Sequence, residues 1–274
     1  MRQRFSSISQ LLILVLACHF IVPSKAQQIQ DSLKMPISLI IMAGQSNMVG
    51  HGKVSDLDSK NLPPNITYHN FGLSSQLEKL PNAFGPEVGL AQVLNDSFPN
   101  QPTVLIKYAV GGSSLLDWSP NYDSVQANVT GHPQFGALYD SLMMRVDSVS
   151  RRVPLRPVAF LWMQGERDAK IAAAGQHYYR NFTTLINRLR HDLEAEELPV
   201  LIGQINPPTE AYPARQQVRR AQDSVVATVS NTVLVRTDDL DKWDDHLHYS
   251  SVGQQELGRR FGFQVVPLLK EIYQ

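Results

Sequence analysis

The fold is decided by the stretch ISLIIMAGQSN, residues 37–47. Its first seven residues are almost all apolar. A short apolar run that ends at a glycine is typical of a strand buried on both faces of a parallel sheet. Reactive side chains of α/β proteins lie where such strands end. Ser46 is therefore the first candidate nucleophile, with the alternative that it caps a short helix.

Four further runs of the same kind follow along the chain. They are short and bounded by Pro, Gly, Asn or Asp, at residues 103–109, 158–163, 199–205 and 232–236. Amphipathic stretches lie between and after them, at residues 87–94, 135–149, 176–193, 214–229 and 252–272. This alternation predicts an α/β protein with a three-layer α/β/α arrangement around a parallel sheet of about five strands. Residues 51–86 and 115–134 show no regular period, so we expect long loops there.

Residues 1–26 are expected to be a signal peptide, and residues 27–274 the folded domain. Basic residues precede the apolar residues 11–17, and a small-residue cleavage site ends at Ala26. The apolar stretch is short for a membrane span. Cys18 leaves a second interpretation open, the lipidated cysteine of a bacterial lipoprotein. The sequence therefore predicts a secreted protein, periplasmic or extracellular.

The charge balance argues against nucleic acid as a partner. The whole chain has 25 basic and 25 acidic residues. Residues 1–26 contain three of the basic residues, Arg2, Arg4 and Lys25, and no acid, so the remainder carries a formal charge of −3. Nucleic-acid-binding domains instead carry clustered positive charge. A chain of this length can bury a conventional core as one domain.

Asp245 and His248 supply what a serine nucleophile needs. Serine is a weak nucleophile until a neighbouring base removes its proton, and histidine suits that task. An acid three residues before the histidine can orient its ring. Asp244 and His246 leave the register open, although adjacent residues point in different directions, which favours Asp245 with His248.

A metal site is the alternative for this acidic segment, residues 238–248, which holds several Asp and His side chains. The segment lacks the glycine and the terminal glutamate of a calcium-binding loop. We therefore expect no metal and no other cofactor.

An acyl-transfer enzyme also needs hydrogen-bond donors for the oxyanion. Gly111 and Gly112 follow the second apolar run and can present backbone N–H groups. Gln164 follows the third run and can present a side-chain amide. The alternative for the two glycines is an ordinary turn after a strand.

Three further residues are candidates for substrate binding. Asn47 lies beside the candidate nucleophile, and Glu166 lies two residues after Gln164. Trp118 offers an aromatic face on which a sugar ring can stack, with the alternative that Trp162 belongs to the core and Trp118 covers it.

Four motifs in this order resemble the sialate O-acetylesterase branch of the SGNH/GDSL hydrolases. They are Gly-Gln-Ser-Asn at 44–47, Gly-Gly-Ser-Ser at 111–114, Trp-x-Gln-Gly-Glu-x-Asp-Ala at 162–169 and Asp-x-x-His at 245–248. The branch is also grouped as carbohydrate esterase family 6, which includes acetylxylan esterases. The resemblance spans roughly residues 36–268, nearly the whole chain after the signal peptide.

The resemblance implies a flavodoxin-like fold and metal-free hydrolysis of acetyl esters on carbohydrates. Ser46 then looks like the nucleophile, His248 the base and Asp245 its orienting acid, with Gly111 or Gly112 and Gln164 as oxyanion donors. The wider superfamily has Gly-x-Asn-Asp in the third motif, whereas this chain has Gln-Gly-Glu, as in the sialate-esterase branch. Besides a sialate esterase, the alternatives are an acetylxylan esterase, an esterase of lipids or aryl esters, and a non-catalytic protein that binds acetylated glycans.

Overall fold

The computed structural model of the chain describes residues 36–59, 61–71, 83–130 and 133–273. The predicted signal peptide and Cys18 lie outside the described residues. Within these ranges, no helix is long and apolar enough to cross a membrane.

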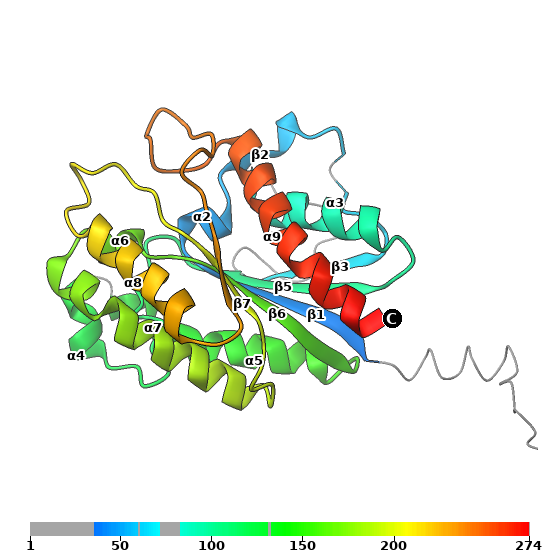
Figure 1. Cartoon of the computed structure of the whole chain (residues 1–274), viewed down its shortest axis with the longest axis horizontal. Helices are drawn as coiled ribbons and strands as arrows, with labels where there is room; N and C mark the ends of the chain where they lie inside the picture. Colours follow the sequence, from blue (N-terminus) through cyan, green and yellow to red (C-terminus); the bar gives the residue numbers. More distant parts are fainter. Residues whose placement is uncertain (1–35, 60, 72–82, 131–132, 274) are drawn as a thin grey trace, which may run out of the picture. The chain divides into compact units, whose positions relative to one another are not determined.

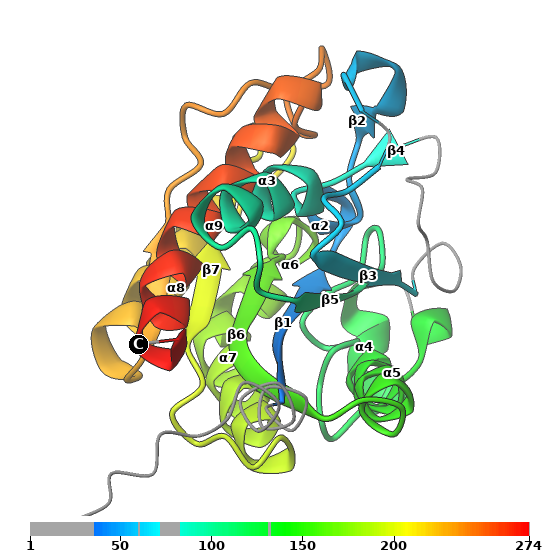
Figure 2. The ribbon, with the colours of Figure 1, turned by 90° about the vertical axis from the view of Figure 1, so that its right-hand side faces the viewer.

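A six-stranded parallel sheet forms the centre of the domain (Figures 1 and 2). Its strands in chain order are β1 (Ile37–Gly44), β3 (Ile66–Asn70), β5 (Thr103–Ala109), β6 (Leu155–Met163), β7 (Val200–Gly203) and β8 (Thr232–Val235). In space the order is β3-β5-β1-β6-β7-β8, and every neighbouring pair is parallel. The five predicted runs form β5-β1-β6-β7-β8, which is the flavodoxin-like strand order.

The sixth strand, β3, corrects the expected number of five. It pairs with β5 from Ile66 opposite Thr103 to Asn70 opposite Lys107, inside the segment that we expected to be a loop. Its sequence, ITYHN, mixes apolar and polar residues, although only Thr67 among the five is exposed. An apolar run is therefore missing. The same segment contains β2 (Gly52–Lys53), which pairs with β4 (Ala83–Phe84) as a short antiparallel ribbon.

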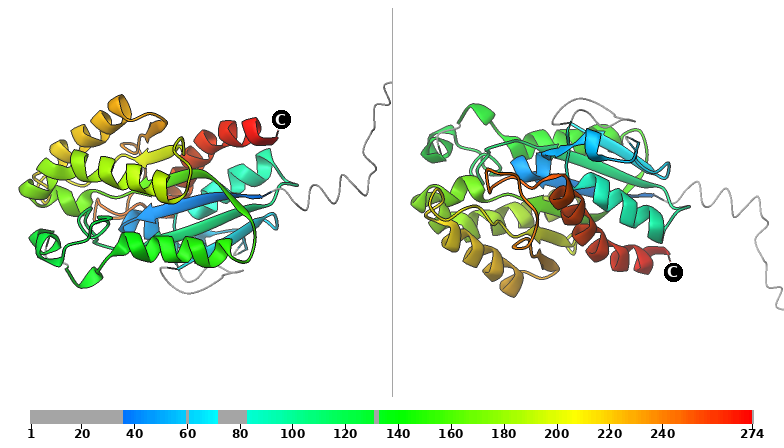
Figure 3. Two further views of the ribbon diagram at one scale, coloured as in Figure 1. Left: turned by 90° about the horizontal axis from the view of Figure 1, so that it is seen from below. Right: turned by 90° about the horizontal axis from the view of Figure 1, so that it is seen from above.

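Helices cover both faces of the sheet, which confirms the three-layer arrangement (Figure 3). On one face α3 (Glu87–Ser97) packs against α9 (Ser251–Tyr273). The other face carries α5 (Leu138–Ser150), α7 (Ala172–Asp192) and α8 (Arg215–Thr228). Short helical turns lie in the connections: α2 (Ser46–Val49), η1 (Val54–Asp56), α4 (Ser124–Ala127), η2 (Asn128–Thr130), η3 (Pro133–Phe135) and α6 (Glu166–Ala169).

The packing of α9 follows from the spacing of its apolar residues. Leu257, Phe261, Val265 and Leu269 recur every fourth residue in α9, and all four are fully buried. Residues at this spacing lie on one face of a helix, so they form one apolar stripe. That stripe covers the sheet, with arginines at the positions between.

Gly44 turns the chain out of the sheet at the end of the central strand. Its φ is +148°, and a Cβ atom there would lie 2.0 Å from the carbonyl oxygen of Met163, so only glycine fits. The N–H of Gln45 then donates to the same Met163 oxygen at 2.9 Å. Ser46 follows as the first residue of α2.

Candidate active site

Ser46, His248 and Asp245 form one hydrogen-bonded chain at the carboxyl end of β1. The Oγ of Ser46 lies 3.1 Å from Nε2 of His248, which is 202 residues away in the sequence. The Nδ1 of the same ring lies 2.6 Å from Oδ2 of Asp245. Gln45, not Ser46, occupies the N-cap position of α2, so the helix-cap alternative does not apply to Ser46.

Asp245 orients His248 through its backbone as well as through its ring. Oδ1 of Asp245 accepts the N–H groups of Leu247 and His248, both at 2.9 Å, and closes a tight turn. Burial works to raise the pKa of Asp245, but these hydrogen bonds and the His248 ring outweigh it, so the pKa is lowered. The carboxylate therefore stays ionised. His246 lies exposed in the turn, and the structure favours the register of Asp245 with His248.

A pocket of about 440 Å³ opens beside Ser46. Its walls come from the segments after β1, β5, β6 and β7 and from the turn before α9. The lining residues are Gln45, Ser46, Val49, His51, Gly111, Gly112, Glu166, Arg167, Lys170, Tyr212, Leu247 and His248. Central β1 has β5 on one side and β6 on the other, so the strand order reverses there. Open α/β sheets bind ligands in the crevice at the carboxyl end of the strands where this reversal occurs.

Three backbone N–H groups at this pocket are free to donate. In the part of the chain that the structure describes, the N–H groups of Ser46, Gly111 and Gly112 have no acceptor. Gly111 lies close to the nucleophile, since a Cβ atom there would be 4.0 Å from the Cβ of Ser46. Gly112 has a φ of +73°, which favours glycine. Gly111 therefore lies where an oxyanion at Ser46 would need a donor, and Gly112 lines the same pocket.

Gln164 does not lie where we predicted an oxyanion donor. Its side chain is fully buried and is absent from the pocket lining. Its Nε2 donates to Oδ2 of Asp168 at 2.6 Å and to the carbonyl oxygen of Ser113 at 3.1 Å. Asp168 also accepts the N–H of Leu115 at 3.0 Å. Gln164 and Asp168 thus hold the segment that follows Gly112, and both N–H groups of the Gln164 amide already have acceptors.

Gln45 provides a free side-chain amide that the sequence analysis missed. Its Oε1 accepts the backbone N–H groups of Gly165 at 3.3 Å and Arg167 at 3.1 Å, which establishes which end of the amide is oxygen. Among the described residues, the side-chain hydrogen bonds of Gln45 all go to its Oε1 and none is made by its Nε2, and Gln45 lines the pocket. Its place directly before Ser46 is the one sequence signal that points to it.

Asn47 and Glu166 differ in their access to the pocket. Asn47 is 1% exposed, and its Nδ2 donates to Oε1 of Glu166 at 2.9 Å and to the carbonyl oxygen of Leu247 at 3.3 Å. Its Oδ1 accepts the N–H of Tyr249 at 3.1 Å. Every polar group of the Asn47 side chain is therefore used inside the protein. Glu166 does line the pocket, and burial raises its pKa against the opposing bond from Asn47.

Trp118 belongs to the core, contrary to the sugar-stacking prediction. Its side chain is fully buried, and its Nε1 donates to Oγ of Ser113 at 2.9 Å. The ring packs edge-on against Tyr108 at 5.6 Å and Trp162 at 5.4 Å between centroids. A ring enclosed by other aromatics leaves no face for a substrate, and Trp118 instead covers the buried Trp162, as the alternative expected.

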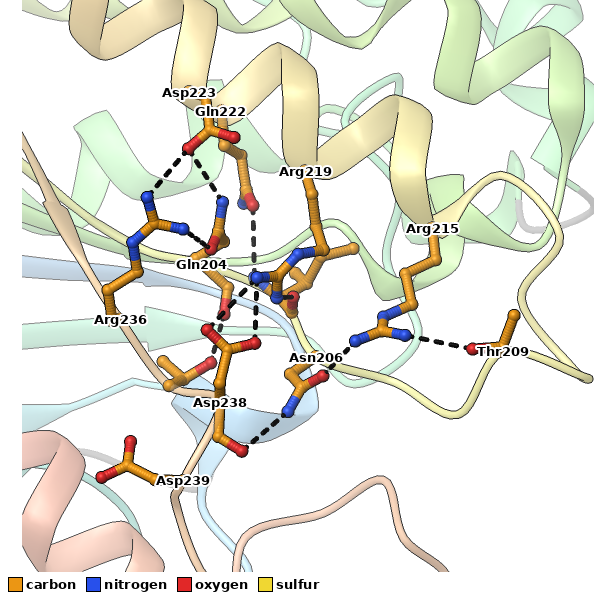
Figure 4. Close-up of polar contacts among 12 residues, drawn as sticks. Gln204, Asn206, Thr209, Arg215, Arg219, Gln222, Asp223, Arg236, Asp238 and Asp239 are labelled. Atoms are coloured by element: carbon orange, nitrogen blue, oxygen red, sulfur yellow. Dashed lines mark hydrogen bonds and ion pairs between the residues drawn. The ribbon is translucent and has the colours of Figure 1, made fainter.

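A polar network fixes the loops after β7 and β8 (Figure 4). Arg219 on α8 pairs with Asp238 at 2.9 Å, and its guanidinium also donates to the carbonyl oxygen of Ile205 at 2.7 Å. Arg215 donates to side chains of Asn206 and Thr209. These bonds tie the first turns of α8 to both strand exits, on the side of the pocket where Tyr212 lies.

Across the described ranges, no group of three or more His, Cys, Asp or Glu side chains is arranged to hold a metal ion. This includes the described acidic segment 238–248, whose side chains instead pair with arginines, such as Asp239 with Arg260 at 2.7 Å, or orient His248.

The sequence and the fold both have known relatives. The chain is 27% identical over 248 residues to a probable carbohydrate esterase of Arabidopsis thaliana, covering 81% of this chain and 88% of that protein. An Arabidopsis thaliana crystal structure superposes with a TM-score of 0.67 at 23% identity, over 85% of this chain and 99% of that one. A carbohydrate acetylesterase from Xanthomonas citri gives 0.63 at 15% identity, over 85% of this chain and 56% of that one. The crystal structure of NanS superposes with a TM-score of 0.59 at 17% identity, over 86% of this chain and 98% of that one.

These structural likenesses support an SGNH-hydrolase-like fold. The sequence model of one family, described as "carbohydrate esterase, sialic acid-specific acetylesterase", matches residues 36–266, which is most of the chain. The chain therefore belongs to the sialic acid-specific acetylesterase family of carbohydrate esterases.

Proposed function

We propose that this protein is a serine esterase that removes O-acetyl groups from carbohydrates through an acetyl-serine intermediate. The observation that carries the proposal is the chain of hydrogen bonds from Ser46 Oγ through His248 to Asp245. In this geometry one ring nitrogen faces the hydroxyl and the other faces a carboxylate, as the serine–histidine–aspartate mechanism requires.

In the first step, Nε2 of His248 takes the proton of Ser46 as Oγ attacks the acetyl carbonyl carbon. The carbonyl oxygen becomes an oxyanion, which the N–H groups of Ser46, Gly111 or Gly112 and the Nε2 of Gln45 would stabilise. The C–O bond to the sugar then breaks, and the proton on His248 passes to the sugar oxygen. The ionised Asp245 stabilises the positive ring throughout.

In the second step, water replaces the sugar. His248 removes a proton from the water, whose oxygen attacks the acetyl-serine carbonyl carbon. The intermediate releases acetate as Oγ regains the proton from the ring. The three residues therefore return to their starting state, and no metal or cofactor takes part in either step.

The substrate proposal rests on the family and on the pocket. The solved relatives include a carbohydrate acetylesterase of Xanthomonas citri, and the family is named for sialic acid. The pocket is small and combines the apolar Val49 and Leu247 with polar side chains such as Arg167 and Lys170. An acetyl group suits such a site better than a long acyl chain, and polar side chains suit a sugar. We further propose that residues 1–26 direct the protein to secretion.

Acetate release tests this proposal. The protein lacking residues 1–26 should release acetate from O-acetylated sialic acid or from acetylated xylan, and Ser46→Ala should release none while keeping its fold. Preference between the two glycans decides between a sialate esterase and an acetylxylan esterase. Binding of either glycan without acetate release by the unmodified protein would overturn the esterase proposal in favour of a glycan-binding protein. A rate that increases with acyl length would overturn the acetyl specificity.

A further inference from the structure

The ring of His248 is held on one face by a second histidine. His51, which follows α2, stacks on His248 with 3.9 Å between ring centroids and 25° between ring planes. We infer that His51 is a positioning residue, whose ring keeps the His248 imidazole aimed at Ser46. The inference rests on the proposed role of His248 as the base, and it assigns the orientation of that base to an aromatic face in addition to Asp245.

The two segments that carry these rings are bonded to each other beside the stack. Nε1 of Trp243 donates to the carbonyl oxygen of His51 at 3.0 Å, and the N–H of Trp243 donates to the carbonyl oxygen of His248 at 2.9 Å. The N–H of Lys53 donates to Oγ of Ser251 at 2.9 Å. The backbone of His51 is therefore anchored to the loop that holds His248, and these hydrogen bonds keep the two rings together.

The His51 ring is neutral at the pH at which His248 would act as the base. The pKa of His51 is lowered to about 4, chiefly by burial and also by the charge of a protonated His248, while Asp245 works in the opposite direction. At neutral pH the ring therefore offers an uncharged aromatic face to the imidazolium that forms when His248 takes the proton of Ser46. A neutral aromatic face attracts a cation, whereas a charged ring would repel it.

Asp245 alone would let the His248 ring tilt, and the stacked His51 ring prevents this motion. The only atom of the His248 ring that the carboxylate bonds is Nδ1, and the Asp245 side chain is 47% exposed, so the ring can tilt about this bond. Such a tilt would carry Nε2 away from Oγ of Ser46, now 3.1 Å distant. A misplacement of about 1 Å can cost about a hundredfold in rate. His51 blocks the tilt because it packs flat on the ring.

The test compares His51→Ala, which removes the face, with His51→Phe, which keeps an aromatic face that cannot titrate. The exposed residue His191 on α7 provides a matched control, His191→Ala. Each variant is measured in three ways: kcat and KM for acetate release, the rate at which a fluorophosphonate labels Ser46, and the NMR signal of the proton between His248 Nδ1 and Asp245. Labelling forms a bond from Oγ to phosphorus and expels fluoride, so it reports activation of Ser46 without any sugar substrate.

We expect His51→Ala to lower kcat and the labelling rate by about tenfold, which is the upper range for one aromatic pair, with little change in KM. The NMR signal should broaden as the ring loosens. His51→Phe should restore most of all three readouts, and His191→Ala should match the unmodified protein.

Several results would overturn the inference. Unchanged kcat and labelling in His51→Ala would show that the face is not needed. A raised KM in both His51 variants with unchanged labelling would make His51 a substrate contact instead. An equal loss of kcat and labelling rate in both variants would assign the effect to a ring nitrogen of His51.

The unmodified protein separates this inference from the proposed function. If it is labelled but releases no acetate, only the substrate proposal fails. If it is not labelled, the roles of His248 and His51 fail together.

Discussion

Asn47 and Glu166 lie 119 residues apart in the chain and are joined by a buried hydrogen bond of 2.9 Å from Nδ2 to Oε1. Asn47 also contacts the backbone on both sides of His248, through the carbonyl oxygen of Leu247 and the N–H of Tyr249. The residue next to the proposed nucleophile thus positions the loop of the proposed base. The distance between Ser46 and His248 is therefore set by the backbone as well as by the side chains.

Asn47→Ala should weaken both stability and the proposed activation of Ser46. The substitution removes three hydrogen bonds and leaves the buried Glu166 without its partner, and each unsatisfied buried group typically costs about 1–3 kcal/mol. We expect a lower free energy of unfolding in urea and slower fluorophosphonate labelling. Asn121→Ala, at an exposed position, is the control. Full stability of Asn47→Ala would show that these bonds are not needed to hold the loop.

Gln45→Glu separates two functions of one side chain. A carboxylate can still accept the N–H groups of Gly165 and Arg167, but it replaces the free Nε2 donor with a negative oxygen. If Gln45 stabilises the oxyanion, kcat should fall about a hundred- to a thousandfold, the usual effect of losing one donor. KM should change far less. An active Gln45→Glu enzyme would exclude Gln45 as an oxyanion donor.

Lys107→Met should destabilise the protein strongly. Nζ of Lys107 pairs with Oε2 of Glu87 at 2.7 Å, both side chains are at most 2% exposed, and Nζ also donates to the carbonyl oxygen of Val49 at the end of α2. Removing one partner of a buried ion pair leaves an uncompensated charge, which costs about 3–5 kcal/mol. The double variant Lys107→Met/Glu87→Gln should regain part of this loss. Chemical denaturation measures both, and equal stability of the single and double variants would contradict this explanation.

Asp168 should make stability depend on pH. Burial raises the pKa of its carboxyl to about 7, from an ordinary value near 3.8 in the unfolded chain. The native state therefore favours the protonated form, so this contribution is complete below pH 3.8 and is lost as pH rises through about 7. The full effect is on the order of 4 kcal/mol.

Asp168→Asn removes this titration. Between pH 5 and pH 8, the free energy of unfolding of the unmodified protein should fall relative to that of Asp168→Asn, as measured by urea denaturation at each pH. Parallel pH profiles for the two proteins would show that Asp168 does not titrate in this range.

The sequence alone predicted those elements and residues whose local pattern is compatible with only one structure. Five strands and five helices could be predicted because burial on both faces demands a continuous apolar run, and burial on one face of a helix demands a period near four. Ser46, Asp245 and His248 could be chosen because each stands at a strand end or at a spacing that suits its chemistry. Strand β3 was missed because its mixed apolar and polar residues form no such run.

The roles of the residues around the pocket were decided only by the tertiary structure. Gln45 and Gln164 carry the same amide, and nothing in the motif shows which one has a free N–H. The answer depends on acceptors from distant segments: Ser113 and Asp168 take both N–H groups of Gln164, whereas the oxygen of Gln45 is held and its nitrogen is left free. Trp118 is enclosed for the same kind of reason, by the rings of Tyr108 on β5 and Trp162 on β6. A local pattern determines an element, but a free donor or an open ring face depends on every neighbour that folding brings to it.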